Sequence, residues 1–300
     1  MSYHVPVLLS AGVAQLLGSP NGVYVDLTLG GGGHSRAVLE ALGPEGRLFC
    51  FDRDAEALAN APCDPRVQVV HANYRDAGQW LSYYGCSPVD GVIADLGVSS
   101  HHFDVAERGF SFQQDGPLDM RMGLGSLLTA AEVVARYEEG PLADVLYRYG
   151  ELRDSRRLAR AIVEARAASP IGTTAALRAA VERALPPRAD KHKVLSCVFQ
   201  ALRIEVNQEL ASLESMLAQL PGLVARGGRV VIISYHSLED RLVKNYLRAG
   251  NAEGRVEQDL KGQTDAPFRM LGRGGAKPSQ EEIAANSRAR SARMRVAERV

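Results

Sequence analysis

Four consecutive glycines that follow a short apolar segment constrain the fold of this chain more than any other feature. Residues 23–26 (VYVD) are apolar and β-branched enough for a buried strand, and the glycines occupy positions 30–33. A helical pattern follows, with Ser35 as its candidate N-cap. Glycine lets the backbone approach a ligand closely, and a helix start offers unpaired N–H groups. This order predicts a nucleotide-type site, and a flexible surface turn is the alternative.

A second apolar segment, residues 46–52 (GRLFCFD), ends on an acid. Asp52 follows the glycines by about twenty residues, the spacing of a Rossmann-like unit. An acid at the tip of the second strand of such a sheet accepts hydrogen bonds from ribose hydroxyls. Asp52 is also placed to cap a helix expected over residues 54–61, and the two roles are compatible.

Strands and helices continue to alternate after Asp52. Residues 67–71 and 89–96 read as strands, and residues 76–84 between them read as a helix. Alternation of this kind predicts a parallel, doubly wound α/β sheet, in which ligands bind outside the carboxyl ends of the strands. Those ends deliver polar side chains to one edge of the sheet: Asp26, Asp52, Asn73, Tyr74 and Asp95.

The pattern changes at residue 97, where a long irregular stretch runs to residue 122. It interleaves aromatic rings with arginines: Phe103, Phe110, Phe112, Arg108 and Arg121. Such a mixture suits stacking on unpaired bases and contacts to phosphates. The alternative is that the rings pack into the core beneath the stretch.

Residues 126–220 read as helices without an intervening strand, which predicts a helical insertion between the fourth and fifth strands. We expect a sheet domain of residues 1–108 and 213–300 and an inserted domain of residues 109–212. Four arginines, at positions 153, 156, 157 and 160, either bind a polyanion or form a solvated face paired with Glu151 and Glu164.

One long helix is expected over residues 193–220. Gln200, Arg203 and Asn207 share a face of it, which either points at the site or is ordinary surface.

The sheet resumes at residues 227–235, and His236 follows at the ligand edge, either as a functional or as a structural histidine. Residues 256–261 and 292–298 are expected to be the last two strands. The basic segment between them reads as an arm that faces nucleic acid or as disorder.

Composition excludes several classes of function. The 300 residues carry no formal net charge, so global charge indicates no partner. The four cysteines form no C-x-x-C pair and are expected to be reduced, and without an H-E-x-x-H motif we expect no metal. No apolar run approaches the roughly eighteen residues of a membrane span, so no membrane partner is expected.

Seven strings, in order along nearly the whole chain, resemble the RsmH (MraW) family. They are residues 26–35 (DLTLGGGGHS), 95–100 (DLGVSS), 108–112 (RGFSF), 115–122 (DGPLDMRM), 199–207 (FQALRIEVN), 236–241 (HSLEDR) and 288–291 (RARS). The resemblance implies an S-adenosylmethionine-dependent methyltransferase that modifies the N4 amine of a cytidine in bacterial 16S (small-subunit) ribosomal RNA. It also implies a class I, Rossmann-like fold with an inserted all-helical domain.

Asp95 is the expected catalytic residue, because it ends a rigid strand near the expected methyl group. The resemblance implies the residues that bind the cofactor. The expected cofactor-binding residues are Gly32, Gly33, His34, Asp52, Tyr74 (usually Phe in the family), Asp95 and His102 (usually Gln). The expected substrate-binding residues are Arg108, Phe110, Arg121, Arg203, Asn207 and His236. The substrate is expected within an assembled or assembling 30S subunit in the cytoplasm. The sequence is compatible with a homodimer and does not decide the oligomeric state.

Three other functions fit the sequence less well. An NAD-linked oxidoreductase would need Gly or Ala where this chain has Ser35 or Arg36. A non-catalytic RNA-binding module would leave the acids at three strand ends without a task. A P-loop phosphotransferase is excluded because no Gly-Lys-Ser/Thr follows the glycines.

Overall fold

The chain divides into two compact units in the computed structural model, which describes residues 6–123, 126, 128–256 and 265–300. The first unit comprises residues 1–97 and 210–300, and the second comprises residues 98–209. The first unit contains two buried apolar cores and the second unit contains one. The domain limits given by the sequence, at residues 108 and 213, stay a prediction.

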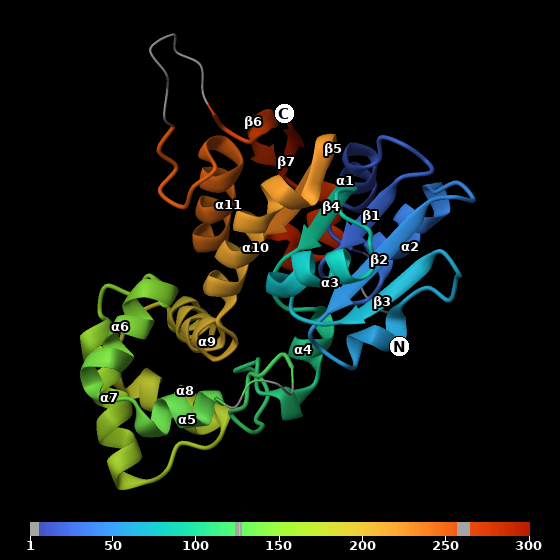
Figure 1. The fold of residues 1–300 in the computed structure, drawn as a ribbon. Coiled ribbons are helices and arrows are strands. Elements are labelled where there is room, and N and C mark those ends of the chain that lie inside the picture. Colours follow the sequence, from blue (N-terminus) through green and yellow to red (C-terminus); the bar gives the residue numbers. More distant parts are fainter. Residues whose placement is uncertain (1–5, 124–125, 127, 257–264) are drawn as a thin grey trace. The chain divides into compact units, whose positions relative to one another are not determined.

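One sheet of seven described strands forms the centre of the first unit (Figure 1). The strands are β1 (Val23–Asp26), β2 (Arg47–Asp52), β3 (Val67–His71), β4 (Val89–Asp95), β5 (Val224–Ser234), β6 (Phe268–Ala276) and β7 (Arg293–Arg299). Their order is β3-β2-β1-β4-β5-β7-β6, with β1 to β5 parallel and β7 antiparallel to both neighbours. The strand order reverses between β1 and β4, which confirms the predicted doubly wound α/β class.

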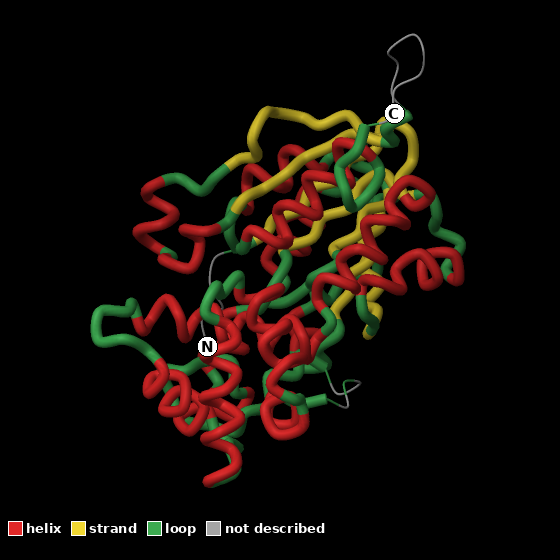
Figure 2. The backbone as a smooth tube through the Cα atoms, turned by 90° about the vertical axis from the view of Figure 1, so that its left-hand side faces the viewer, coloured by secondary structure: helices red, strands yellow, loops and turns green. Residues whose placement is uncertain are grey.

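Alternate side chains of the strands enter two separate cores, one on each face of the sheet. On β2, Phe49 and Phe51 join one core, whereas Leu48 and Cys50 join the other. The first core is covered by α3 (Ala77–Tyr83), α10 (Glu209–Leu223) and α11 (Ser237–Ala249), and the second by α1 (Leu9–Leu16) and α2 (Gly33–Ala41). Figure 2 shows the strands in yellow with helices in red along them. Burial on both faces explains why these strands read as continuous apolar runs.

The described helices of the second unit pack around a core of their own. They are α4 (Ser100–Asp104), α5 (Ala130–Arg136), α6 (Glu139–Gly150), α7 (Ser155–Ala168), α8 (Thr174–Ala184) and α9 (Lys191–Asn207). Helix α5 begins with a capping box, in which Thr129 Oγ1 accepts from the Glu132 N–H and Glu132 Oε2 accepts from the Thr129 N–H. The isolated bridge between Pro117 and Thr173 ties the irregular stretch to this unit.

Two expected elements were wrong. The helix expected over residues 193–220 is two helices, because Gln208 adopts a left-handed φ of 50° and ends α9. The helix expected over residues 54–61 is only a short 3₁₀ turn, Ala57–Asn60.

Of the strand expected over residues 256–261, positions 257–261 lie outside the described residues. A strand that the sequence did not predict, β6, spans Phe268–Ala276. Three glycines with positive φ and a register shift conceal β6 from a search for alternation. A last short helix, α12 (Gln280–Ala285), follows it. None of the helices in the described ranges is long and apolar enough to cross a membrane.

Candidate active site

The glycine turn between β1 and α2 is fastened to the end of β2. The Gly30 N–H donates to Asp52 Oδ2 at 2.8 Å, and Asn60 Nδ2 donates to the Gly30 carbonyl at 2.8 Å. Gly32 has a φ of 73°, and a Cβ atom there would lie 2.4 Å from the Asn60 carbonyl oxygen. Because any side chain at Gly32 would be both strained and blocked, the turn needs glycine.

Asp52 occupies the tip of β2, half-buried. Its Oδ1 accepts from the Asp54 N–H at 2.9 Å, so both carboxylate oxygens bind backbone N–H groups. Instead of capping a helix, Asp52 holds the glycine turn in place.

Asp26 ends β1 and is 1% exposed. Its Oδ2 accepts from Ser35 Oγ at 2.6 Å and its Oδ1 from the Thr28 N–H at 3.0 Å. Burial raises the pKa of Asp26 above its ordinary value, and the proximity of His34 opposes that rise. Asp26 therefore joins the end of β1 to the first turn of α2.

Asp95 ends β4, the strand next to β1. Its Oδ1 accepts a hydrogen bond from the hydroxyl of Tyr235 at 2.8 Å, and its Oδ2 lies 3.8 Å from Nδ1 of His34. Burial raises the pKa of Asp95 to about 6, against the opposing effects of His34 and Tyr235, while Asp26 and Glu239 raise it further. Asp95 is thus a carboxylate that can gain or lose a proton near neutral pH.

His34 lies in the first turn of α2 and is 5% exposed. Its Nε2 has no hydrogen-bond partner among the described residues. The helix N-cap is Gly32, which supplies no capping side chain to the first-turn N–H groups. A buried polar atom without a partner and a helix start without a cap are features that a bound polar ligand would satisfy.

Tyr74 directly follows the turn after β3 and packs its half-buried ring against the core that contains Phe49 and Phe51. Gly32, Gly33, His34, Asp52, Tyr74 and Asp95 therefore all belong to the first unit, at the carboxyl ends of β1 to β4 or directly after them. Two of these residues, Asp52 and Asp95, are acids, and a third acid, Asp26, ends β1 nearby. Together the three carboxyl groups favour a ligand with positive charge.

The remaining expected cofactor-binding residue, His102, lies in the second unit and is 7% exposed. Its Nδ1 is 2.9 Å from Ser99 Oγ, and its ring centroid is 4.8 Å from that of Phe110. Phe110 is buried in the core of the second unit, and Phe103 and Phe112 pack against it. For these rings the structure favours the core alternative over exposed stacking.

Three other expected substrate-binding residues of the second unit, Arg108, Arg121 and Asn207, support the loop of residues 118–122. Arg121 donates twice to Asp119, at 2.8 and 2.7 Å, and Arg108 donates to the Arg121 carbonyl at 3.1 Å. Asn207 Nδ2 donates to the Met120 carbonyl at 2.7 Å, and its Oδ1 accepts from the Met122 N–H at 2.8 Å.

Arg203 pairs with Glu209 at 2.8 and 3.0 Å. A role of these side chains toward a substrate stays a prediction.

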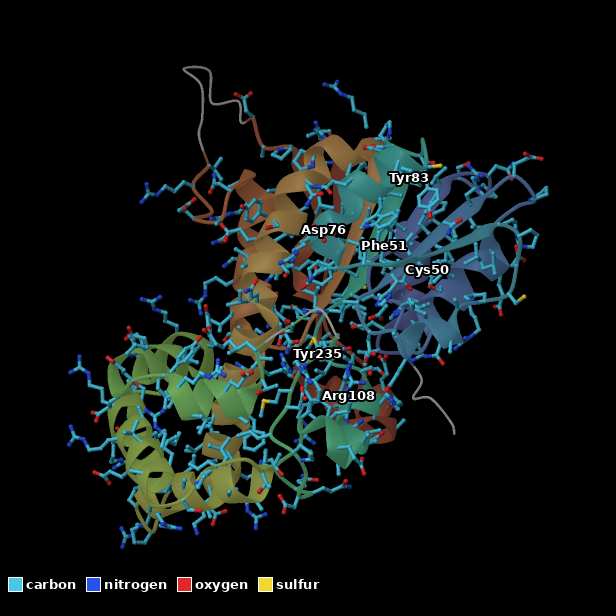
Figure 3. The ribbon with its side chains drawn as sticks, turned by 60° about the horizontal axis from the view of Figure 1, so that its bottom comes forward. Cys50, Phe51, Asp76, Tyr83, Arg108 and Tyr235 are labelled. Carbon is cyan, nitrogen blue, oxygen red and sulfur yellow. The ribbon has the colours of Figure 1, made fainter. Side chains whose placement is uncertain are left out.

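His236 is the N-cap of α11, where its Nδ1 accepts from the Glu239 N–H at 3.4 Å. Its Nε2 lies 3.2 Å from Glu239 Oε1 but makes no hydrogen bond among the described residues. The capping contact is compatible with a structural role, and a role of His236 toward the substrate stays a prediction. Tyr235, its neighbour (labelled in Figure 3), instead reaches the catalytic candidate Asp95.

Comparison with known proteins gives the family. A family model described as the MraW methylase family matches residues 1–300. The chain belongs to this family.

It is similar over 299 residues, at 50% identity, to ribosomal RNA small subunit methyltransferase H of Parabacteroides distasonis, covering 99% of this chain and 98% of that one. It is 48% identical over 300 residues to the protein of the same name from Flavobacterium johnsoniae, covering 100% and 99% of the two chains. Among solved structures, an rRNA methylase from Streptococcus thermophilus covers 97% of this chain and 93% of its own, at 11% identity and a TM-score of 0.40, too distant to bear on function.

Membership in the MraW methylase family confirms the resemblance given by the seven strings of the sequence. The sequence missed Tyr235 as a residue of this site. A tyrosine directly after a buried strand, at the edge where the acids also emerge, was the available signal.

Proposed function

We propose that this protein transfers a methyl group from S-adenosylmethionine to the exocyclic N4 amine of a cytidine in 16S (small-subunit) ribosomal RNA. The observation that carries the proposal is Asp95, a carboxylate at the switch point of the sheet with one oxygen held by Tyr235. The other oxygen, Oδ2, has no hydrogen bond within the described residues. Support for the reaction and its substrate comes from the family match and from the names of the relatives.

The residues of the first unit fit the cofactor. When bound, S-adenosylmethionine supplies a methyl group on a positively charged sulfonium. Asp52 would accept from ribose hydroxyls, the turn at Gly32 and Gly33 and the unpartnered Nε2 of His34 would hold polar groups, and Tyr74 would lie beside the adenine. The neighbouring acids Asp26 and Asp95 stabilise positive charge at this edge of the sheet. From the second unit, His102 is proposed as a further cofactor contact.

The amine of cytosine is a weak nucleophile because its lone pair is delocalised into the ring. In our proposal, Asp95 Oδ2 accepts an N–H of that amine, which orients the nitrogen and localises its lone pair. The nitrogen loses one proton as it gains the methyl group, and Asp95, with a pKa of about 6, is the acceptor. Positioning and electrostatics supply most of the acceleration. The base must be unpaired or turned out of a helix to reach the site.

The RNA-binding groups in the proposal are Arg108, Phe110, Arg121, Arg203, Asn207 and His236. Because most of them also hold the structure together, they would act chiefly by fixing the backbone that the RNA meets. We place the reaction in the cytoplasm, on an assembled or assembling 30S subunit, and a homodimer is compatible with it.

The test uses methyl-labelled S-adenosylmethionine with two substrates, naked 16S ribosomal RNA and 30S subunits from a strain that lacks this activity. Nucleoside analysis should find the label in N4-methylcytidine at one position, and the Asp95→Asn protein should transfer it about 100-fold or more slowly at the same enzyme concentration. Transfer to the subunit alone would establish the assembled substrate. Label on another atom, or on neither substrate, would remove the proposed reaction. Binding of NAD in place of S-adenosylmethionine would favour the oxidoreductase.

A further inference from the structure

Tyr235 connects the end of β5 to the end of β4. It is the first residue after Ser234, and its half-buried ring packs against the core that contains Leu48 and Cys50. From there its hydroxyl donates to Asp95 Oδ1 at 2.8 Å. The bonded pair is separated by 140 residues in the chain.

The backbone of Tyr235 is fixed as firmly as its ring. Its N–H donates to Glu239 Oε2 at 3.0 Å, and Glu239 is 3% exposed in the first turn of α11. The hydroxyl is thus held from two sides, by the packed ring and by the helix start. A donor that is already in place loses little entropy when it binds its acceptor.

The two oxygens of Asp95 consequently have different surroundings. Oδ1 is occupied by the hydroxyl, whereas Oδ2 lies 3.8 Å from His34 Nδ1, beyond hydrogen-bond range. The Asp95 N–H donates to Thr28 Oγ1 at 2.6 Å, so the backbone of Asp95 is also anchored. Because its backbone and Oδ1 are both held, the carboxylate of Asp95 has little freedom to rotate. The orientation of Oδ2 is therefore fixed.

We propose that Tyr235 is a positioning residue, which holds Asp95 through Oδ1 so that Oδ2 is presented to the amine that is methylated. The inference rests on the proposed function of Asp95 and extends it to a residue outside the expected site. Without the hydroxyl, the carboxylate can turn about its last torsion angle, and the amine is oriented in only a fraction of the bound complexes.

Removal of the hydroxyl also changes proton binding by Asp95. The charged or titratable groups that act on Asp95 are His34, Asp26, Glu239 and Tyr235, and Glu282 in turn acts on Tyr235. A donor to a carboxylate stabilises its ionised form. Loss of the donor therefore raises the pKa of Asp95, and a larger share of the enzyme is protonated at any pH near 6.

The test is Tyr235→Phe, which keeps the ring and removes only the hydroxyl. In the protein without cofactor, ¹³C NMR of labelled aspartate carboxyl groups, with Asp95 assigned by its loss in Asp95→Asn, should show the pKa of Asp95 above that of the wild type. Single-turnover methylation at saturating cofactor should fall about 10- to 100-fold at pH 8. The acid limb of its pH profile should move upward, and cofactor affinity should change less than threefold.

The matched control is Tyr24→Phe. The hydroxyl of Tyr24 is bonded to the backbone of Gly18 and Ser19, before β1 and hence at the opposite edge of the sheet, so it touches no acid of the site. This variant should lower the melting temperature and leave the pH profile in place.

The possible results separate the inference from the proposed function. A raised pKa of Asp95 with an unchanged rate would overturn the positioning role and leave the methyltransferase reaction standing. An unchanged pKa would overturn the bond itself, whatever the activity. If wild-type protein methylates no ribosomal RNA, the proposed function fails, and a positioning role for that reaction fails with it.

Discussion

Replacement of Asp95 by Asn should make the protein more stable and nearly inactive, and the stability gain should depend on pH. Asn has almost the shape of Asp and can still accept from Tyr235 through Oδ1, but it carries no charge. The change therefore isolates the negative charge that burial opposes.

The magnitude follows from the pKa of Asp95, which burial raises from 3.8 to about 6. At about 1.4 kcal/mol for each factor of ten, the folded state disfavours the ionised carboxylate by about 3 kcal/mol. Because the folded pKa lies above the unfolded one, the wild type loses stability as the pH rises from about 4 to 6, and the loss is complete above that range. The gain in the Asn protein should be about 3 kcal/mol at pH 7.5 and about 1 kcal/mol at pH 4.5.

Melting curves of the two proteins at both pH values measure the gain. Single-turnover methylation at saturating cofactor should fall by about two or more orders of magnitude, the effect of removing a positioned acceptor. Cofactor affinity should change less, because the loss belongs mainly to the transition state.

The matched control is Asp90→Asn at the start of the same strand, where Asp90 Oδ2 accepts from the Val23 N–H at 2.7 Å. This variant should show neither the pH-dependent gain nor the loss of turnover. If Asp95→Asn proved less stable than the wild type at pH 7.5, the electrostatic reasoning would be wrong. A normal single-turnover rate would remove Asp95 from catalysis.

Three further predictions concern other parts of the chain. Asp52→Ala should weaken S-adenosylmethionine binding by about 1.5–3 kcal/mol, the scale of a lost charge-assisted hydrogen bond, and unchanged affinity in calorimetry would reject the ribose contact. Neutralising Arg153, Arg156, Arg157 and Arg160 should weaken RNA binding and flatten its salt dependence. In the structure Arg157 pairs with Asp154 and Arg160 pairs with Glu139, rather than with the expected Glu151 and Glu164. An unaltered salt slope would show that the four arginines form a solvated face. Asn207→Ala should destabilise the second unit by about 2–4 kcal/mol, because the Met120 carbonyl and the Met122 N–H lose their partner, and an unchanged unfolding midpoint in urea would contradict this.

The sequence by itself determined the class of fold and the edge of the sheet at which the site lies. Strand direction and the alternation of strands with helices depend on local patterns, so the ends of β1, β2 and β4 could be found at Asp26, Asp52 and Asp95. The glycine turn was equally visible, because only glycine tolerates the backbone of Gly32. The seven strings that resemble the family are each contiguous in the chain, so they could be recognised without a structure.

Where local patterns were weak, the sequence failed. Nothing near Gln208 indicates that α9 ends there, because a left-handed residue without glycine or proline leaves no signal. Strand β6 was overlooked for the opposite reason, since its glycines imitate a loop although β7 pairs with it.

Only the tertiary structure decided which side chains meet. The bond from Tyr235 to Asp95 and the two bonds from Asn207 to the loop of residues 118–122 join positions at least 85 residues apart. The raised pKa of Asp95 is likewise a consequence of burial by distant segments, not of its neighbours in the chain. A sequence lists donors and acceptors, but packing fixes their distances and excludes the water, and those two quantities set the strength of each contact.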